Sequence, residues 1–451
     1  MSYWIKCIGL LFLSAALVTG CDFLDDDDDA SNDGNATNVN NTNNNDNNDG
    51  DNDGDNDEEL AGGWYGYELD VPDGVARHDV RVTGIHCESA DECAVSTYVP
   101  LDHGFIVGAT TSGSTGVVYN GETLSDELAG TDFRFHGFNQ TSLGLHARLS
   151  ASYRFVLGDG DLTDPASWDN IRPGTNDSES DFSVLNDQWL LADDGNDNWV
   201  FHYRGVMFRT DEEPSEITHW AGVWAPNRNP PYPNDHADRK SADDTLCDSS
   251  PEISISPTTT QYSEAASDLS WIMITANALD QRGSDPSGVC VSEDMGDNFY
   301  QVPFPDANND DNYGPQAVYC IDDDHCWAYG GRTFADDSAM IYYTTNASDG
   351  RDMDWSRGTL PDGLPDDGVV PKHVFFAPDA QHGWMTGNVK NDTMLFQTTD
   401  GGATWEDISN GLRAASGGTR MHAGFALDEN RIFIGGEDDV LYYHENSGLT
   451  D

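Results

Sequence analysis

The sequence predicts an all-β fold: a β-propeller of about seven four-stranded blades, with six or eight blades as open alternatives. Three observations predict it: a strand-rich unit that recurs about every 55 residues, turn residues between its strands, and almost no helical periodicity. A single four-stranded sheet cannot bury both of its faces, whereas stacked copies can. Residues 61–451 are assigned to this propeller domain.

The N-terminus has the pattern of a secretory signal. Residues 1–20 combine a positive charge at Lys6, a short apolar run and small residues, and Cys21 follows them. The apolar run is too short to cross a bilayer comfortably as a mature helix. The stretch Val18–Cys21 resembles a bacterial lipobox, which implies that Cys21 is lipidated and becomes the mature N-terminus. An ordinary signal peptide that contains Cys21 by chance and an uncleaved membrane anchor are the alternatives.

Residues 21–60 are predicted to form a disordered tether. Residues 22–59 contain fifteen acidic and no basic residues, among long Asn runs. Such a segment buries too little apolar surface to offset chain entropy, and its like charges extend it. The run Asp49–Glu59 has alternating carboxylates like a calcium loop, but Leu60 stands where an EF-hand has its bidentate Glu. We therefore expect a solvated spacer and no cofactor, with calcium binding as the alternative.

The composition excludes some classes of partner. The chain has 81 acidic and 21 basic residues and a formal net charge of −60. Nucleic acid is excluded because its binding requires phosphate neutralisation by Lys and Arg. An acidic membrane surface would repel the chain, which leaves the lipid anchor as its expected membrane contact. Together with the signal, this predicts a lipid-anchored protein of the bacterial cell envelope, facing the periplasm or the cell exterior.

The domain contains six cysteines, an even number that suits an oxidising compartment. Two pairs, Cys87–Cys93 and Cys320–Cys326, each enclose five residues with an acidic turn between apolar runs. A β-hairpin would bring such cysteines within disulfide reach. Elimination then pairs Cys247 with Cys290.

A metal site is the alternative reading of these cysteines. It would need four convergent ligands. His86 and His325 stand beside cysteines, but alternation along a strand turns neighbours to opposite faces. Disulfides are therefore favoured, and no metal site is expected.

The first half of the repeat is an apolar strand, a polar turn and a strand with Trp-x-x-Gly. This pattern occurs at Trp327–Gly330 and, 57 residues later, at Trp384–Gly387. Ile432–Gly435 takes the same place in the last unit, and the segment that begins at Arg81 fits the same frame. The short segment Ala61–Leu69 is expected to supply the outer strand of the last blade, because that closure removes an exposed sheet edge.

The second half of the repeat is an Asp-bearing turn between two strands. "TTDGGATW" spans Thr398–Trp405 and "SEDMGDNF" spans Ser292–Phe299. Thr344–Trp355 is a looser copy, and "LTDPASW", Leu162–Trp168, is a worn one. In such a turn Asp accepts hydrogen bonds from backbone N–H groups, and Gly supplies positive φ. The terminal aromatic buries area between blades.

The pattern Ser/Thr-x-Asp-x-Gly-x-Thr-Trp resembles the Asp-box, or BNR repeat, of sialidase-like propellers. The stretch Phe375–Ile408 resembles the repeats of the Ycf48/HCF136 photosystem II assembly family, and this resemblance covers about residues 270–445 well and 80–130 in part. It implies a structural role at the blade periphery, away from the central site. The residues concerned are Ser292, Asp294, Gly296, Phe299, Thr398, Asp400, Gly402 and Trp405. Phe299 departs from the Trp of the motif, and Asn346 departs from its Asp.

The preferred function is a non-catalytic binding or assembly module that uses one face of the ring for a protein or glycan partner. The alternative is a sialidase-like glycoside hydrolase. That family's pattern includes an arginine triad and an early Phe/Tyr-Arg-Ile-Pro motif, which "NIRPG" at Asn170–Gly174 does not match. Since the many carboxylates make some acid pair inevitable, no catalytic residue is assigned.

Aromatic residues gather in the Pro-rich segment His219–His236. We expect a loop over one end of the ring, because the segment is too long and too rich in proline for a strand turn. Trp220, Trp224 and Tyr232 are the candidate ligand contacts. Covering an exposed core edge is the alternative role of these side chains.

Overall fold

The computed structural model describes twenty segments of the chain, from residue 58 to residue 445. They are 58–60, 63–100, 104–121, 134–141, 144–150, 155–171, 188–193, 199–203, 206–210, 221–224, 263–266, 270–275, 288–295, 300–305, 315, 317–330, 339–362, 364, 369–389 and 392–445. The chain divides into two compact units, residues 1–53 and 54–451, and all described residues belong to the second. The predicted signal peptide, Cys21 and almost all of the predicted tether lie outside the described residues.

The described strands form consecutive antiparallel meanders, which we number as blades. Blade 1 contains β3 (Arg81–Ser89), β4 (Glu92–Tyr98), β5 (Phe105–Thr110) and β6 (Gly113–Asn120). Blade 2 contains β7 (Arg134–Thr141), β8 (Gly144–Ser150), β9 (Phe155–Gly158) and β10 (Trp168–Ile171). Blade 3 contains β11 (Gln188–Asp193), β12 (Trp199–Tyr203), β13 (Val206–Thr210) and β14 (Ala221–Trp224).

The second half of the chain repeats this arrangement. Blade 4 contains β15 (Ser263–Ala265), β16 (Ile272–Thr275), β17 (Gly288–Ser292) and β18 (Tyr300–Pro303). Blade 5 contains β19 (Ala317–Cys320), β20 (Cys326–Gly330), β21 (Met340–Thr344) and β22 (Ser356–Arg357). Blade 6 contains β23 (Val369–Phe376), β24 (Gly383–Val389), β25 (Asp392–Thr398) and β26 (Glu406–Asp407). Blade 7 contains β27 (Met421–Ala426), β28 (Arg431–Gly436), β29 (Val440–Glu445) and β2 (Trp64–Glu68), which β1 (Glu58–Glu59) extends.

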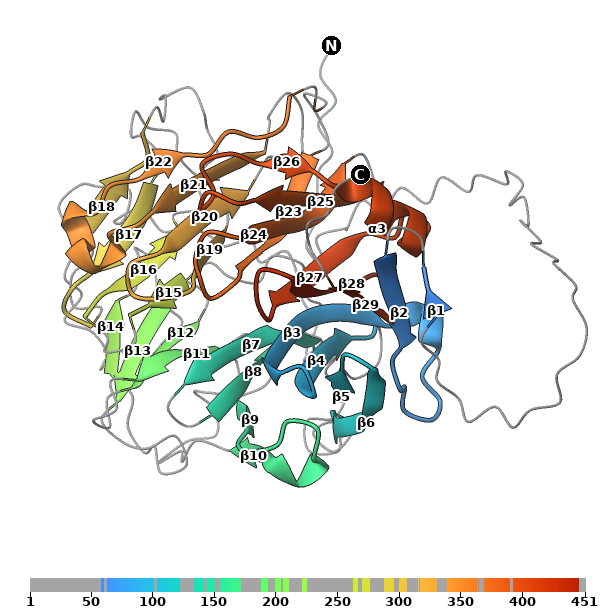
Figure 1. Cartoon of the computed structure of the whole chain (residues 1–451). Helices are drawn as coiled ribbons and strands as arrows, with labels where there is room; N and C mark the ends of the chain where they lie inside the picture. The colour runs from blue at the N-terminus through green and yellow to red at the C-terminus, as the bar shows by residue number, and fades with distance from the viewer. Residues whose placement is uncertain are drawn as a thin grey trace, which may run out of the picture. The chain divides into compact units, whose positions relative to one another are not determined.

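The blades surround a common centre. The first strand of each blade is innermost, and Figure 1 shows β3, β7, β11, β15, β19 and β27 around the middle of the ring. Strand β23 contacts the neighbouring inner strand β27. Successive blades touch through these strands, as in β3 with β7, β15 with β19, and β27 with β3. Pairing of Gln188 with Leu149 also joins blades 2 and 3 into one eight-stranded sheet. The predicted β-propeller of four-stranded blades is therefore confirmed, and seven such meanders are described.

The hydrophobic core lies between the blades. Each cluster of buried apolar side chains joins two neighbours: one cluster packs Ile106 of blade 1 against Phe135 of blade 2, and another packs Trp327 of blade 5 against Phe376 of blade 6. The rings of Trp327 and Phe376 stack with their centroids 3.5 Å apart. This is the burial that a single blade cannot achieve alone.

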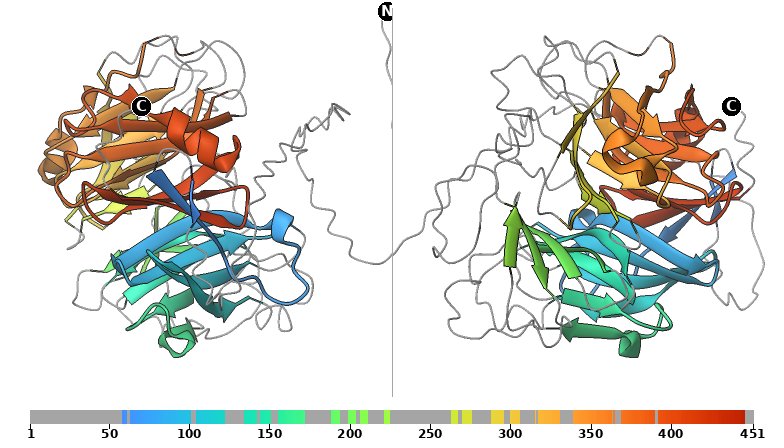
Figure 2. Two further views of the ribbon diagram at one scale, coloured as in Figure 1. Left: turned by 45° about the vertical axis from the view of Figure 1, so that its right-hand side comes forward. Right: turned by 90° about the vertical axis from the view of Figure 1, so that its left-hand side faces the viewer.

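The two ends of the domain meet in blade 7. Strand β2 pairs with β29 from Trp64 opposite His444 to Glu68 opposite Val440, as the sequence predicted for the segment Ala61–Leu69. In Figure 2 these blue strands lie beside the red strands of the C-terminus. Trp64 is fully buried, and a core cluster joins blades 7 and 1 across this closure. The ring therefore leaves β29 no free edge.

Helical segments are few in the described part of the chain. The α-helix α3 (Ser409–Ser416) follows blade 6 and ends at Gly417, whose φ of 68° is left-handed. It packs through Leu412, which is fully buried. Short 3₁₀ turns are η2 (Arg77–Asp79), η3 (Pro165–Ser167) and η6 (Ala347–Asp352). Helix α3 was not predicted from the sequence.

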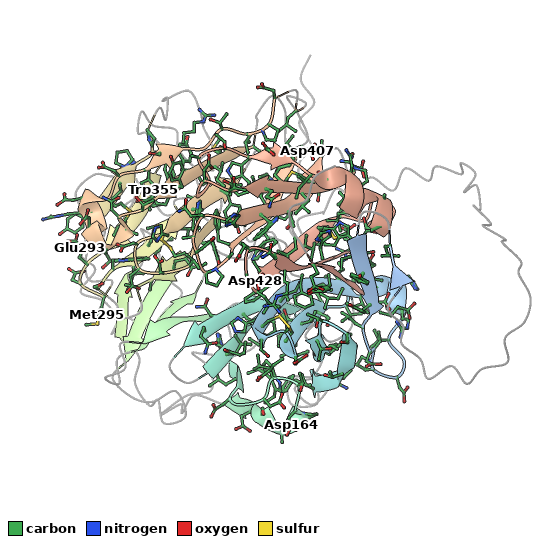
Figure 3. All side chains as sticks on the ribbon, in the orientation of Figure 1. Asp164, Glu293, Met295, Trp355, Asp407 and Asp428 are labelled. Atoms are coloured by element: carbon green, nitrogen blue, oxygen red, sulfur yellow. A yellow bond between two sulfur atoms is a disulfide. The ribbon has the colours of Figure 1, made fainter. Side chains whose placement is uncertain are left out.

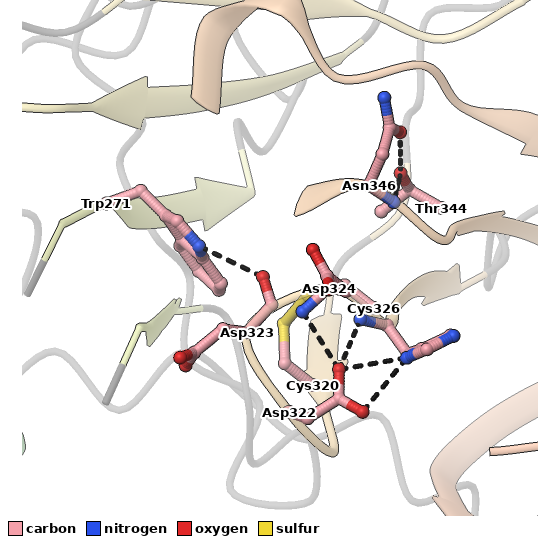
Figure 4. The surroundings of a disulfide bond; sticks show 9 residues. Trp271, Cys320, Asp322, Asp323, Asp324, Cys326, Thr344 and Asn346 are labelled. Carbon is pink, nitrogen blue, oxygen red and sulfur yellow. Dashed lines mark hydrogen bonds and ion pairs between the residues drawn. A yellow bond between two sulfur atoms is a disulfide. The ribbon is translucent and has the colours of Figure 1, made fainter. Parts of the chain in front are cut away.

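Two of the three expected disulfides are present. Cys87–Cys93 joins β3 to β4, and Cys320–Cys326 joins β19 to β20. Figure 4 shows the second bridge, where the turn it closes accepts a hydrogen bond from the indole of Trp271 in blade 4. Cys290 is disulfide-bonded, but its expected partner Cys247 lies outside the described residues. That pairing stays a prediction.

Candidate functional site

A cavity of about 260 Å³ lies at the centre of the ring. Residues of six inner strands, β3, β7, β15, β19, β23 and β27, line it together with Ile321, which follows β19. Its chemically distinctive lining residues are His86, Glu264, Tyr319, His373, Phe376 and Phe425. These six residues come from five different inner strands. The cavity is therefore a product of ring closure.

Two glycines allow the inner strands to approach one another at this cavity. A Cβ on Gly84 would stand 2.3 Å from the Cα of Gly137 on the next inner strand. A Cβ on Gly424 would stand 2.0 Å from the ring of Phe375. Side chains at Gly84 or Gly424 would therefore force neighbouring blades apart.

The electrostatics of the lining favour neutral imidazole and neutral phenol. Burial lowers the pKa of His86 despite the nearby Glu88 carboxylate, whose Oε1 lies 3.3 Å from His86 Nε2. Burial raises the pKa of Tyr319, and the charges of Glu264 and Asp322 raise it further.

The lining residues lie toward the ends of their strands, beside a repeated turn. In blades 5, 6 and 7 the carboxylate of an Asp accepts hydrogen bonds from the backbone N–H groups of the residues two and three positions later. It also pairs with the side chain of the residue three positions later. The pairs are Asp322–His325 at 2.9 Å, Asp379–His382 at 2.6 Å and Asp428–Arg431 at 2.6 Å. Burial acts against ionisation, but these hydrogen bonds lower the pKa of all three carboxyls. Their role is to hold the turns.

Basic residues collect near the beginnings of the inner strands instead. Burial lowers the pKa of His422 against the effect of Glu437, and the charges of Lys372 and Arg81 lower it further. Arg420 Nη1 and His422 Nε2 each lie 3.4 Å from Glu437 Oε1. Burial opposes ionisation of Glu437, but these neighbours hold its pKa at about 2. The two ends of the inner strands therefore differ in charge.

Charged side chains are few in the described lining of the cavity. Among the described lining residues Glu264 is the one carboxylate, and none is an arginine. The arginine triad of a sialidase is therefore not brought together there. Within the described segments, no group of three or more His, Cys, Asp and Glu side chains could hold a metal ion. No helix in the described residues is long and apolar enough to span a membrane.

The Asp-box of blade 6 is a structural turn. Asp400 accepts hydrogen bonds from the Thr398 hydroxyl at 2.8 Å, the Thr404 N–H at 2.8 Å and the Thr404 hydroxyl at 2.6 Å. Burial works against ionisation, but these bonds lower the pKa of Asp400. Trp405 donates its indole N–H to the carbonyl oxygen of Gly402 at 3.0 Å. These three hydrogen bonds of the Asp400 carboxylate all lie within the turn.

The other copies keep part of this geometry. Thr344 donates to Asn346 Oδ1 at 2.9 Å, so the amide oxygen takes the place of the carboxylate. Ser292 donates to Asp294 Oδ1 at 3.0 Å, whereas Gly296 and Phe299 lie outside the described residues. Figure 3 labels residues in or next to these turns, and they lie at the periphery: Asp164, Glu293, Met295 and Trp355. Asp428 lies near the centre.

The aromatic candidates are not brought to the cavity by any described contact. Trp224 is the last residue of strand β14 and pairs with Met207. At this residue the structure therefore has a strand in place of the expected loop over the ring. The indole of Trp224 and the whole of Trp220 and Tyr232 are not described. The residues that line the cavity were not predicted from the sequence as a site. The lining residues share no residue type or local spacing, so no local pattern in the sequence marks them.

No protein-family model and no curated protein matches the chain. Solved structures with a similar fold include "YCF48 bound to D1 peptide", with 12% identity, a TM-score of 0.47, and 86% of this chain and 97% of that chain covered. YCF48 from Cyanidioschyzon merolae has 12% identity and a TM-score of 0.48, with 85% and 98% covered. A GH74 xyloglucanase from Xanthomonas campestris has 12% identity and a TM-score of 0.46, with 85% of this chain but only 54% of that chain covered. Similarities this weak carry no argument, and the propeller assignment stands on the sheets themselves.

Proposed function

We propose that this chain is a cell-envelope lipoprotein whose propeller binds a protein or glycan partner without transforming it chemically. Cys21 would carry the lipid, residues 22–60 would act as a spacer, and the ring would present its turn end to the partner. The supporting observation is the central cavity, which collects aromatic and polar side chains from six inner strands. Concave sites with apolar walls and a few polar groups are typical of binding pockets.

A glycoside hydrolase of sialidase type is the alternative. It would need arginines and a Tyr–Glu pair converging on a substrate in this cavity. Tyr319 and Glu264 both line it, but the described lining supplies no arginine. No observation on the described residues therefore favours the hydrolase over the binding module.

Site-specific photocrosslinking in the native envelope tests the binding function. A photoreactive amino acid would replace Gln140, an exposed residue at the cavity, or Glu406, an exposed residue of the outer strand β26. We expect a discrete crosslinked partner from position 140 and none of that size from position 406. Equal crosslinking from both positions, or none from either, would contradict a binding site at the centre of the ring.

A further inference from the structure

We propose that the central cavity receives an aromatic side chain from a basic segment of the partner protein. This inference rests on the proposed function, because it names what enters the same site and which class of partner supplies it. Three features of the described residues carry it: lining polar groups that are already bonded, aromatic rings that face the cavity, and acidic turns beside it.

Polar side chains of the lining already interact with other residues of the protein. His86 Nε2 lies 3.3 Å from the Glu88 carboxylate, and the hydroxyl of Tyr319 has a hydrogen bond with the backbone of Phe376. Further lining residues that interact with other residues are Thr83, Asn139, Glu264 and His373. A sugar, which needs several hydrogen bonds when buried, would have to displace such contacts, whereas an apolar group leaves them intact.

Aromatic rings supply the apolar surface of the cavity. Phe138, Tyr319 and Phe425 come from three different inner strands, and each is only partly buried. The rings of His86 and Phe425 make an edge contact with their centroids 5.3 Å apart, which ties β3 to β27 at this wall. An entering aromatic ring gains stacked or edge-to-face contacts with these side chains in addition to the burial of apolar area.

The volume of the cavity limits how much of a partner can enter. About 260 Å³ admits one large side chain, not a folded segment. The rest of the partner segment must therefore lie over the turns beside the cavity. These turns decide which residues can flank the entering side chain.

The turns beside the cavity are acidic. The described turns that follow the inner strands of blades 1, 5, 6 and 7 comprise residues 88–92, 321–325, 378–382 and 427–431. Together they contain nine carboxylates, two histidines and one arginine. Burial opposes ionisation, but hydrogen bonds within the turns lower the pKa of Asp322, Asp379 and Asp428, so these carboxyls keep their charge near pH 7. Lysines or arginines next to the entering side chain are therefore attracted to this end of the ring.

The opposite end of the inner strands has the opposite charge. Arg81, Lys372 and Arg420 lie at or near the beginnings of β3, β23 and β27. A basic segment is repelled by these side chains. Charge therefore directs such a partner to the turn end, where the cavity lies.

Synthetic peptides test this proposal on the full-length mature protein, with binding measured by saturation-transfer NMR. The probe is acetyl-KGKFKGK-amide, which we expect to bind. Replacing its Phe by Ala should weaken binding at least about tenfold, because the burial of a phenyl ring is lost. The peptide acetyl-EGEFEGE-amide keeps the ring but should not bind, since the acidic turns repel it. Binding of either control peptide as tight as that of the probe would overturn the proposal.

A neutral oligosaccharide, cellopentaose, serves as a competitor in the same measurement. We expect it to leave the probe bound, because the polar side chains of the lining already have partners. Displacement of the probe by cellopentaose would show that the cavity takes a glycan, and would overturn the proposal.

Variants locate the site. Phe425→Leu keeps an apolar side chain but removes a ring from the cavity wall, and should weaken the probe about two- to tenfold. Tyr300→Leu removes a ring from the exposed outer strand β18 and should leave the affinity unchanged. Equal effects of the two variants would contradict entry into the cavity. If position 140 crosslinks a partner but the probe fails to bind, the binding function stands and this inference fails. If both fail, both proposals are rejected.

Discussion

The indole Nε1 of Trp327 donates a hydrogen bond of 2.8 Å to the carbonyl oxygen of Gly401. This bond joins the second strand of blade 5 to the Asp-box turn of blade 6. Thr359 of blade 5 forms two backbone hydrogen bonds with the same turn. Its N–H donates to the carbonyl oxygen of Ala403 at 2.9 Å, and its carbonyl oxygen accepts the N–H of Trp405 at 2.9 Å. The Asp-box turn of blade 6 is thus hydrogen-bonded to blade 5 and links the two blades.

Replacing Trp327 by Phe should weaken this link between blades 5 and 6. The variant keeps an aromatic ring but loses the bond to Gly401, for which we expect a loss of about 1 kcal/mol in the free energy of unfolding. Trp384 provides a matched control: it has the same place in blade 6 and is fully buried, but its indole nitrogen has no hydrogen-bond partner among the described residues. Urea unfolding should show a larger loss for Trp327→Phe than for Trp384→Phe. Equal losses would mean that the bond to Gly401 contributes nothing.

Asp400 should matter for stability and not for binding. Asp400→Ala removes the acceptor of three hydrogen bonds in the turn, so we expect a loss of about 2 kcal/mol in unfolding free energy. Asp400→Asn should cost less, since Asn346 holds the equivalent turn of blade 5 through its amide oxygen. Urea unfolding gives the stabilities, and crosslinking from position 140 gives the binding. A stable Asp400→Ala variant that has lost its crosslink would contradict a structural role.

Acid should destabilise the domain in part through Glu437. Its pKa is lowered from 4.5 to about 2 in the folded state, so the unfolded chain takes up a proton first as pH falls. The stability that Glu437 contributes is therefore complete above pH 4.5 and is lost as pH falls toward 2. His422, whose pKa is also lowered, adds a loss that begins at higher pH, below its ordinary 6.5.

The variant Glu437→Gln isolates this contribution. It should be less stable than the wild type at pH 7, and its stability should fall less steeply below pH 4.5. Denaturant unfolding at a series of pH values measures both quantities, with the exposed Glu406→Gln as the control. A parallel fall in wild type and Glu437→Gln would show that this carboxylate gives no pH-dependent stability.

Cys21 should determine membrane attachment. If it carries the lipid, Cys21→Ser should move the protein from the membrane fraction to the soluble fraction, because the remaining acidic chain has no affinity for an acidic bilayer. Fractionation after an alkaline wash measures this, with Cys7→Ser as the control inside the signal. Retention of Cys21→Ser in the membrane would support an uncleaved anchor instead.

The sequence predicts the fold well where each blade repeats its turn chemistry. Trp327 and Trp384 occupy the same place in blades 5 and 6, and β2 closes the ring as the segment Ala61–Leu69 suggested. Blades 2 and 3 were not delimited, because the stretch from β7 to β14 keeps only a worn Asp-box at Leu162–Trp168. Helix α3 was missed because eight residues give too short a window for helical periodicity.

The candidate site could not be predicted in the same way. His86, Glu264, Tyr319 and His373 come from different blades and have no common residue type or local spacing. They share only a position on the inner strand of their blade. Closure of the ring brings these strands, and therefore these residues, close together. The Asp-boxes, which the sequence displays most clearly, are turns at the periphery (Figure 3).

Amide hydrogen exchange across β2 tests most directly whether the seven blades close into one ring. Pairing of Trp64–Glu68 with β29 is the bond that closes the circle, and the central cavity depends on it. We expect the amides of β2 to exchange as slowly as those of β28 and β29, because all belong to one sheet. Exchange of β2 at the rate of an unstructured peptide, with β28 still protected, would contradict the closed ring.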